Sequence, residues 1–203
     1  MIASPRIFCL TLPEKPERTE RARKHFQERG VSAEFFKAIH GPTAGLSTIH
    51  PYEVDNPGSG FRMGFVPTGI FLAHYMLWSA IMLLDNEHFL ILEDDAQFPL
   101  GWGNRVGQAL SDAPLDFDML YIGSCCCAGR PQTQIKGEVW EVKYPQCLHA
   151  YIVAKKALPV LLSTNRKIYA PVDIALNFHS HPLLKVYTVL PAIVMQEETV
   201  LAP

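Results

Sequence analysis

Short apolar runs alternate with amphipathic segments along most of this chain. In the first half, apolar runs predict strands, and segments with helical spacing of apolar residues predict helices. The predicted strands lie at 7–12, 35–39 and 88–92, and the predicted helices lie at 16–29, 67–84 and 102–110. This order of elements favours an α/β fold, a three-layer sandwich with a mixed, largely parallel sheet.

The second half of the chain is richer in strands. A hairpin is expected at 134–144, with its turn at Gly137. The other predicted strands lie at 118–122, 148–153, 185–190 and 193–195, and helices are predicted at 155–163 and 171–178. Residues 41–64 show little periodicity and are rich in Gly, Pro and Ser, so they predict a long loop within a single domain spanning residues 1–203.

Composition and charge exclude several classes of protein. The chain has 203 residues, of which 48% are hydrophobic, and its net charge is -2. A near-neutral chain without a basic patch gives no expectation of nucleic-acid binding. The longest apolar segment, 69–84, is shorter than the span of about 20 residues that crosses a membrane, so no transmembrane segment is expected.

The five cysteines form an odd set without C-x-x-C spacing. This pattern argues against both a disulfide framework and a structural zinc site. The N-terminus has no basic region followed by a long apolar stretch, so no signal peptide is expected. We therefore predict reduced thiols and a cytoplasmic location.

Three acids, Glu93, Asp94 and Asp95, directly follow the apolar run at 88–92. Ligands of open α/β sheets bind beyond the carboxyl ends of the strands, where adjacent carboxylates would repel one another. A divalent cation such as Mn²⁺ or Mg²⁺ removes that repulsion and keeps coordination positions for substrate phosphates. The alternative interpretation is an acidic turn that faces solvent.

Neither glycine-rich phosphate-binding motif, G-x-G-x-x-G or G-x-x-x-x-G-K-[ST], occurs in the chain. A metal would then have to replace the phosphate-binding loop, which favours a metal-dependent nucleotide-sugar transferase. A metal-dependent phosphohydrolase could use the same acids, although such sites usually gather a second group of ligands around two metals.

The order of several motifs resembles glycosyltransferase family 25, which contains lipooligosaccharide and collagen galactosyltransferases. The motifs lie at 7–12 with 16–18, at 69–74, at 90–95, at 118–123, at 149–157 and at 171–173. The resemblance spans nearly the whole chain. It implies a GT-A fold, a UDP-galactose donor, a manganese ion and inversion at the anomeric carbon.

The resemblance implies roles for residues near the acids. Asp95 is expected to contact the metal directly and to act in catalysis. Asp94 is the second candidate metal ligand and is also expected to bind substrate, and Glu93 is expected to orient these two acids and to bind substrate. Arg18 could pair with donor phosphate, although an arginine at a helix start is also a common surface residue. Thr11, at the end of the first strand, is a further candidate for substrate binding.

Two other candidates lie elsewhere in the chain. His74 matches the histidine of the family's Ser-His pair, but Ala73 replaces the serine, and a lone histidine in an apolar helix can also be a satisfied core residue. Asp173, in a Pro-x-Asp at a helix start, is either an N-terminal helix acid or the general base of an inverting transfer.

The last candidates are in the final 25 residues. His179 and His181 could share a face if extended and complete the metal shell, or they could belong to a polar loop. Gln196 occupies a family-like substrate position after the last strand, but the serine expected soon after it is absent.

These observations together predict a metal-dependent inverting glycosyltransferase for a nucleotide-sugar donor and a glycan or glycoconjugate acceptor, as in lipopolysaccharide biosynthesis. A lipid-linked acceptor would add peripheral membrane contact. A noncatalytic sugar- or nucleotide-binding domain of the same fold is the alternative that Ala73 and the missing serine keep open.

Overall fold

One eight-stranded sheet forms the centre of the computed structural model, which describes residues 4–38, 53–54, 65–125 and 132–197. From edge to edge its strands are β2 (Glu34–Lys37), β1 (Arg6–Thr11), β4 (His88–Glu93), β9 (Gln146–Ala154), β6 (Met119–Cys125), β11 (Val186–Val189), β8 (Val139–Val142) and β7 (Gln132–Lys136). Strands β8 and β9 run opposite to the other six. The expected mixed sheet, with most strands in one direction, is confirmed.

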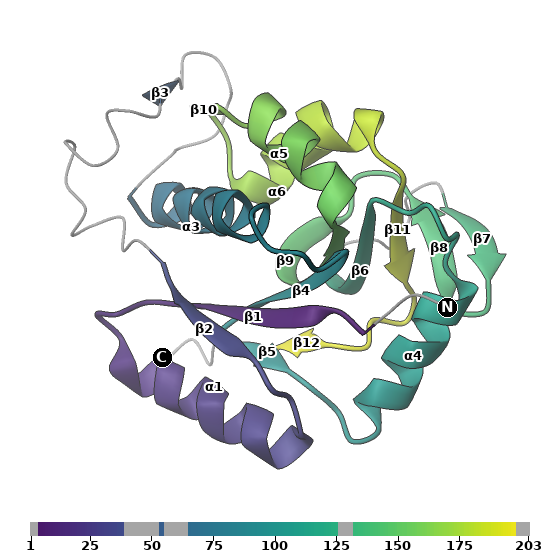
Figure 1. Cartoon of the computed structure of the whole chain (residues 1–203), viewed down its shortest axis with the longest axis horizontal. Helices are drawn as coiled ribbons and strands as arrows, with labels where there is room; N and C mark the ends of the chain where they lie inside the picture. The colour runs from purple at the N-terminus through teal and green to yellow at the C-terminus, as the bar shows by residue number, and fades with distance from the viewer. Residues whose placement is uncertain (1–3, 39–52, 55–64, 126–131, 198–203) are drawn as a thin grey trace, which may run out of the picture.

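Helices cover both faces of this sheet and make three layers (Figure 1). Helices α1 (Pro16–Arg29) and α4 (Trp102–Asp112) lie on one face, and α3 (Phe65–Ile81), α5 (Leu158–Thr164) and α6 (Val172–Ala175) lie on the other. Side chains of β4 alternate between two cores: Phe89 and Ile91 pack beneath α3, whereas Leu90 and Leu92 pack toward α1 and α4. Burial on both faces explains why β4 is an unbroken apolar run.

Element ends in the first half follow local signals in the sequence. Pro16 begins α1, and Gly30 ends it with a φ of 68°, a conformation that glycine adopts without a Cβ clash. Helix α3 begins at Phe65, two residues before the predicted start at Pro67, and ends at Ile81. Strand β2 follows α1 where a second strand was predicted.

The predicted hairpin is confirmed as β7 and β8, joined at Gly137. Gly137 has a φ of 54°, which side chains with a Cβ rarely adopt, and a Cβ there would also meet the carboxylate of Asp112, so this turn favours glycine. Helix α5 is shorter than predicted because Pro159 is confined to its first turn, and a 3₁₀ turn, Lys155–Ala157, precedes it. Helix α6 continues into a π-helical turn, Leu176–Ser180.

Two short strand pairs lie outside the main sheet, and neither was predicted. Strand β12 (Met195–Gln196) pairs with β5 (Ala96–Gln97), which brings the C-terminal segment beside the acids that follow β4. Strand β3 (Glu53–Val54) pairs with β10 (Lys167–Ile168). Apart from β3, the loop predicted at 41–64 lies outside the described residues.

The expectation that all thiols are reduced is wrong for one pair of cysteines. Cys125 on β6 and Cys147 on β9 form a disulfide, with their Cα atoms 5.8 Å apart. The two residues are 22 positions apart, and they meet because β6 and β9 are antiparallel neighbours. Cys9 is free and buried in the core.

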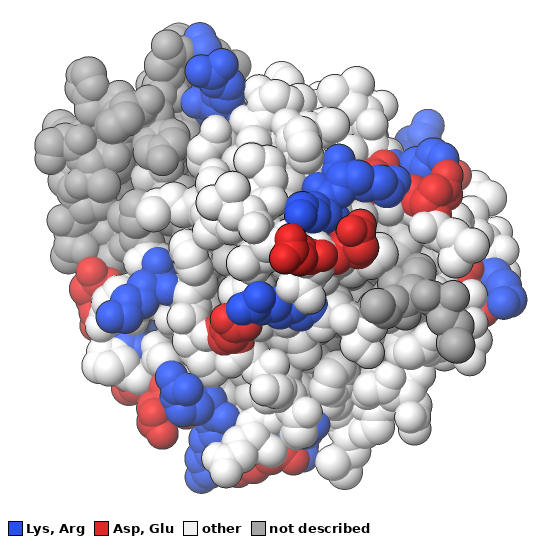
Figure 2. All heavy atoms as spheres, in the orientation of Figure 1, with Lys and Arg blue, Asp and Glu red and all other residues white. Residues whose placement is uncertain are grey.

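Charged side chains of both signs are intermixed on the face of the molecule seen in Figure 2. Ion pairs of the described residues include Arg105 with Glu138 at 2.7 Å and Lys156 with Asp118 at 2.6 Å. In the part of the chain that the structure describes, no helix combines the length and the apolar character needed to cross a membrane.

Candidate active site

The three acids lie at the carboxyl end of β4, as the sequence predicts. Strand β4 ends at Glu93, and Asp94 and Asp95 form the turn that leads to β5. Strand β1 is parallel to β4, with Leu10 opposite Glu93, so both strands end at the same edge of the sheet. Helix α1, which begins after β1, therefore presents its first turn to the acids.

Arg18, in that first turn, forms an ion pair with Asp94. Its Nη2 also lies 3.7 Å from Oδ2 of Asp95. The side chain of Asp94 is only 7% exposed and that of Asp95 is 23% exposed. One guanidinium thus partly compensates two acids that are largely removed from water.

Burial disfavours the ionised form of all three acids, but the net shift of each pKa depends on the partners of that acid. Burial and the charges of Glu93 and Asp94 together raise the pKa of Asp95 to about 6, against the opposing charge of Arg18. Burial also raises the pKa of Asp94, although Arg18 lowers it directly. Burial alone would raise the pKa of Glu93, but the hydrogen bond from His74 and nearby positive charge bring it below its ordinary value. Glu93 is therefore the acid of the three most readily held in its ionised form.

The acids leave two buried oxygens available to a cation. Oδ2 of Asp94 and Oδ1 of Asp95 are inaccessible to solvent and have no hydrogen-bond partner. Within the described ranges, no group of three or more His, Cys, Asp or Glu side chains is arranged to hold a metal. Two carboxylates are nonetheless a sufficient protein contribution for Mn²⁺ or Mg²⁺, which take their other ligands from water and phosphate. Asp94 and Asp95 fit such an ion.

A cavity of about 260 Å³ opens beside these acids. All the residues predicted to bind substrate line this cavity, together with Asp95: Thr11, Arg18, His74, Glu93, Asp94 and Gln196. The remaining lining comes from the end of β1, the start of α1 and the face of α3. The structure thus brings together residues from five separate parts of the sequence.

Gln196 reaches this cavity through the pairing of β12 with β5. Its Nε2 donates a hydrogen bond to Oδ2 of Asp95 at 3.4 Å. The backbone N–H of Glu197 donates to the backbone carbonyl of Asp95 at 2.8 Å. Strand β12 therefore contacts both the side chain and the backbone of Asp95.

Asp173 lines a second cavity, of about 220 Å³, rather than the first. Ile70, Glu93 and Gln196 line both cavities, so the two are neighbours. The carboxylate of Asp173 accepts a hydrogen bond from the backbone N–H of Cys147 at 3.1 Å. Asp173 therefore lies in the cavity that adjoins the acids, and Glu93 lines both.

His179 and His181 are not brought to the acids, so the predicted four-residue metal set is not assembled. His179 is exposed and packs against Tyr169, with ring centroids 4.9 Å apart. His181 contacts Tyr121 Oη at 3.1 Å and Asn177 Oδ1 at 2.8 Å. The π-helical turn that carries His179 prevents the extended backbone on which the predicted shared face depended.

Sequence reasoning missed the residues that support His74. His74 Nε2 lies 3.2 Å from Oε1 of Glu93, and its Nδ1 lies 3.0 Å from the hydroxyl of Tyr151. Trp78 donates its indole N–H to the same hydroxyl at 2.8 Å. The spacing of four residues between His74 and Trp78, on one helix face, was a readable signal. The contact with Tyr151 on β9 depends on the tertiary fold.

Comparison with known proteins adds to this geometry. The sequence model of glycosyltransferase family 25 (LPS biosynthesis protein) matches residues 4–127. A glycosyltransferase 25 family member of Aedes aegypti is 28% identical over 197 residues, covering 87% of this chain and 31% of that protein. An inactive glycosyltransferase 25 family member 3 of Mus musculus is 24% identical over 213 residues, covering 88% of this chain and 36% of that protein. The chain spans about a third of the length of these relatives.

A solved structure supports the fold. A glycosyltransferase involved in the glycosylation of the major capsid of PBCV-1 aligns with a TM-score of 0.51 and 13% identity, covering 96% of this chain and 94% of that chain. This likeness concerns the fold alone, which is of the GT-A type. Because the family's sequence model covers more than half of the chain, including the acids after β4, the chain belongs to glycosyltransferase family 25.

Proposed function

We propose that the protein is a metal-dependent, inverting glycosyltransferase that moves galactose from UDP-galactose to a glycan or glycoconjugate. The observation that carries this proposal is the pair of buried, unpartnered oxygens of Asp94 and Asp95, in a cavity that Arg18 also lines. Two carboxylates can bind a cation, and the neighbouring guanidinium can bind a phosphate group at the same time.

Asp94 and Asp95 would hold the metal, which is Mn²⁺ or Mg²⁺ in this proposal. When bound, the ion neutralises negative charge on the leaving diphosphate. Arg18 binds a phosphate oxygen of the donor with its planar guanidinium, which matches phosphate geometry. Gln196 and Thr11, which also line the cavity, offer an amide and a hydroxyl to the rest of the donor.

Asp173 serves as the general base in the neighbouring cavity. The acceptor hydroxyl gives its proton to the Asp173 carboxylate while its oxygen forms a bond to the anomeric carbon. The bond between that carbon and the diphosphate oxygen breaks, and its electron pair leaves with UDP. Attack from the Asp173 side, opposite the leaving group, inverts the anomeric configuration. The two adjoining cavities suit this division into donor and acceptor sides.

The acceptor class follows from the proposed chemistry and from the family. The family's description names LPS biosynthesis, so a growing lipopolysaccharide glycan is the proposed acceptor. A lipid-linked glycan would bring the protein to a membrane surface without a spanning segment.

The test measures UDP release from UDP-galactose with and without Mn²⁺, in the presence and absence of lipooligosaccharide. A thermal-shift series with other UDP-sugars identifies the donor, because a ligand at 100 times its dissociation constant stabilises the native state by about 2.7 kcal/mol. We expect release that depends on both metal and acceptor. A protein that is stabilised by UDP-galactose yet transfers nothing would contradict the proposal.

The second candidate function is a noncatalytic nucleotide-sugar-binding domain. The observation that favours it is the mouse relative, which carries the family's sequence and is named inactive. The same assay separates the two, since a binder shows stabilisation without release. A phosphohydrolase would need a second set of metal ligands, and no cluster of three candidate ligands occurs where the structure is described.

A further inference from the structure

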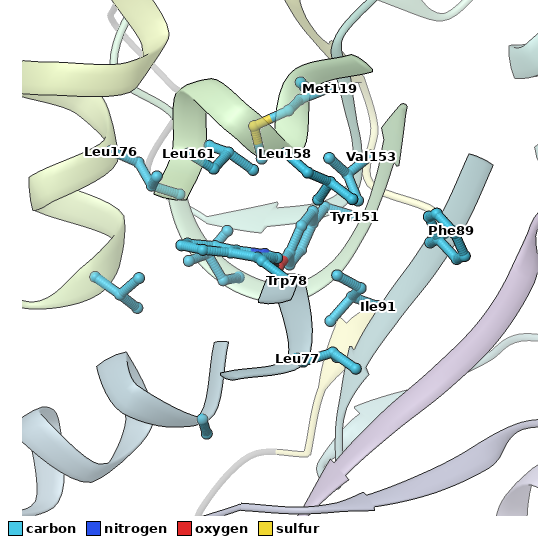
Figure 3. Close-up of a cluster of buried hydrophobic side chains, with 14 of the residues drawn as sticks. Leu77, Trp78, Phe89, Ile91, Met119, Tyr151, Val153, Leu158, Leu161 and Leu176 are labelled. Atoms are coloured by element: carbon cyan, nitrogen blue, oxygen red, sulfur yellow. The ribbon is translucent and has the colours of Figure 1, made fainter. Parts of the chain in front are cut away.

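A chain of buried hydrogen bonds ends on Glu93, the charged residue that lines both cavities. Trp78, Tyr151 and His74 form this chain, and all three are completely buried. Figure 3 shows the indole nitrogen of Trp78 beside the hydroxyl oxygen of Tyr151. His74 and Trp78 come from α3, and Tyr151 comes from the centre of β9, where it lies opposite Ile91 of β4.

The direction of each hydrogen bond follows from the donors and acceptors available. An indole N–H only donates, so the Tyr151 hydroxyl accepts from Trp78 Nε1 at 2.8 Å. The single hydroxyl proton of Tyr151 is then directed to Nδ1 of His74 at 3.0 Å. With Nδ1 as acceptor, the ring proton of His74 is on Nε2, which donates to Oε1 of Glu93 at 3.2 Å.

The opposite tautomer of His74 is unfavourable in this geometry. A proton on Nδ1 would place the lone pair of Nε2 against a carboxylate oxygen of Glu93. It would also leave the Tyr151 hydroxyl proton without His74 as its acceptor, and a buried unsatisfied polar group is destabilising. The indole of Trp78 therefore determines which nitrogen of His74 carries the proton.

We propose that Trp78, Tyr151 and His74 are a relay of positioning residues that fixes the orientation of the Glu93 carboxylate for sugar transfer. This inference rests on the proposed function and adds to it two residues that contact neither cavity, Trp78 and Tyr151. The relay uses Oε1 of Glu93, so Oε2 stays available to a sugar hydroxyl at the boundary between the two cavities. A hydrogen bond to a carboxylate is stronger than one between neutral groups, so it restricts the rotation of this side chain.

A matched pair of variants tests the relay. Tyr151→Phe removes the hydroxyl that connects Trp78 to His74. Tyr121→Phe removes the hydroxyl of an equally buried tyrosine, whose ring centroid lies 6.0 Å from that of Tyr151 and which contacts His181 instead. We expect Tyr151→Phe to lower kcat about tenfold or more while the affinity for UDP with Mn²⁺ stays within twofold. Tyr121→Phe should keep kcat within twofold of wild type.

Nitrogen-15 NMR of the histidine rings gives a readout that is independent of turnover. In the wild-type protein the proton of the neutral His74 ring should be on Nε2, and in Tyr151→Phe the resonances should shift toward a mixture of tautomers. His74→Gln, whose amide can still donate to Glu93, should keep more turnover than His74→Leu. A wild-type proton on Nδ1, or equal losses of kcat in Tyr151→Phe and Tyr121→Phe, would overturn the relay.

The two readouts separate failure of the relay from failure of the proposed function. If the wild-type protein transfers no sugar, the proposed function fails. The NMR measurement still tests the relay, because a His74 ring proton on Nε2 supports it and a ring proton on Nδ1 rejects it. If transfer occurs but Tyr151→Phe keeps its full kcat, the relay fails while the proposed function stands.

Discussion

Nη2 of Arg18 lies 3.7 Å from Oδ2 of Asp95, and the same guanidinium is paired with Asp94. A cation of the protein thus already contacts the acids that we propose to hold a metal. Arg18 must then act both as a competitor of the metal for the carboxylates and as a partner of the donor phosphate. These two roles predict opposite effects of one substitution.

Arg18→Ala should bind Mn²⁺ alone more tightly than wild type, because a positive charge is removed from beside the ion. The same variant should bind UDP in the presence of Mn²⁺ about tenfold or more weakly, since a hydrogen bond to a charged group contributes about 1.5–3 kcal/mol. Calorimetry with Mn²⁺ alone and then with UDP measures both. Equal UDP affinity in the wild type and the variant would leave Arg18 with a structural role only. Arg21 is an exposed residue of the same helix, and Arg21→Ala is the control.

Asp95→Asn should abolish metal-dependent UDP binding while leaving the fold intact. Burial and the neighbouring charges of Glu93 and Asp94 disfavour the ionised form of Asp95, so the neutral amide relieves repulsion in the metal-free protein. The free energy of unfolding of the metal-free variant should therefore equal or exceed that of wild type. Denaturant unfolding and UDP calorimetry check the two expectations separately, and unchanged metal-dependent affinity would reject Asp95 as a ligand.

Asp173→Asn should keep the affinity for UDP with Mn²⁺ and lower turnover about a hundredfold, a usual contribution of a general base. The amide oxygen can accept only one of the two backbone N–H groups, of Cys147 and Ile174, that the carboxylate accepts, so some loss of stability should accompany the loss of turnover. Steady-state kinetics and calorimetry on the same preparation test this separation of binding from chemistry. Normal turnover would make Asp173 a helix-start acid, and lost UDP affinity would make it a donor contact.

The contribution of His181 to the stability of the protein should fall as the pH decreases below about 6.5, the ordinary pKa of histidine. Burial lowers the pKa of His181 to about 3. The unfolded state therefore binds a proton between these two values that the folded state does not bind. In that window His181 should contribute a loss of up to about 1.4 kcal/mol per pH unit to the free energy of unfolding.

Comparison with His181→Gln isolates this contribution, because burial also lowers the pKa values of His25, His88 and His149. The difference in unfolding free energy between wild type and His181→Gln should change with pH below 6.5, in favour of the variant at lower pH. Urea unfolding at several pH values from 7 to 5 measures it. A difference that stays constant over this range would contradict the buried, uncharged state of His181.

The sequence by itself determined the features that depend on local signals. The unbroken apolar run of β4 required burial on both faces, and the acids directly after it had to lie at the edge of the sheet. Pro16, Gly30 and Gly137 marked a helix start, a helix end and a hairpin turn because each depends on backbone conformations within a few residues. The motifs that resemble glycosyltransferase family 25 also lie in these locally coded segments.

Only the tertiary structure decided which distant residues meet. Gln196 reaches Asp95, 101 positions earlier, through the pairing of β12 with β5; a strand was predicted at 193–195, but its partner β5 was not. The pairing of β6 with β9 joins Cys125 to Cys147, and the packing of α3 on β9 joins Trp78 to Tyr151. The placement of His181 against Tyr121, away from the acids, was decided in the same way. Strand order and helix packing set these contacts, and both are properties of the whole chain that no local pattern of residues encodes.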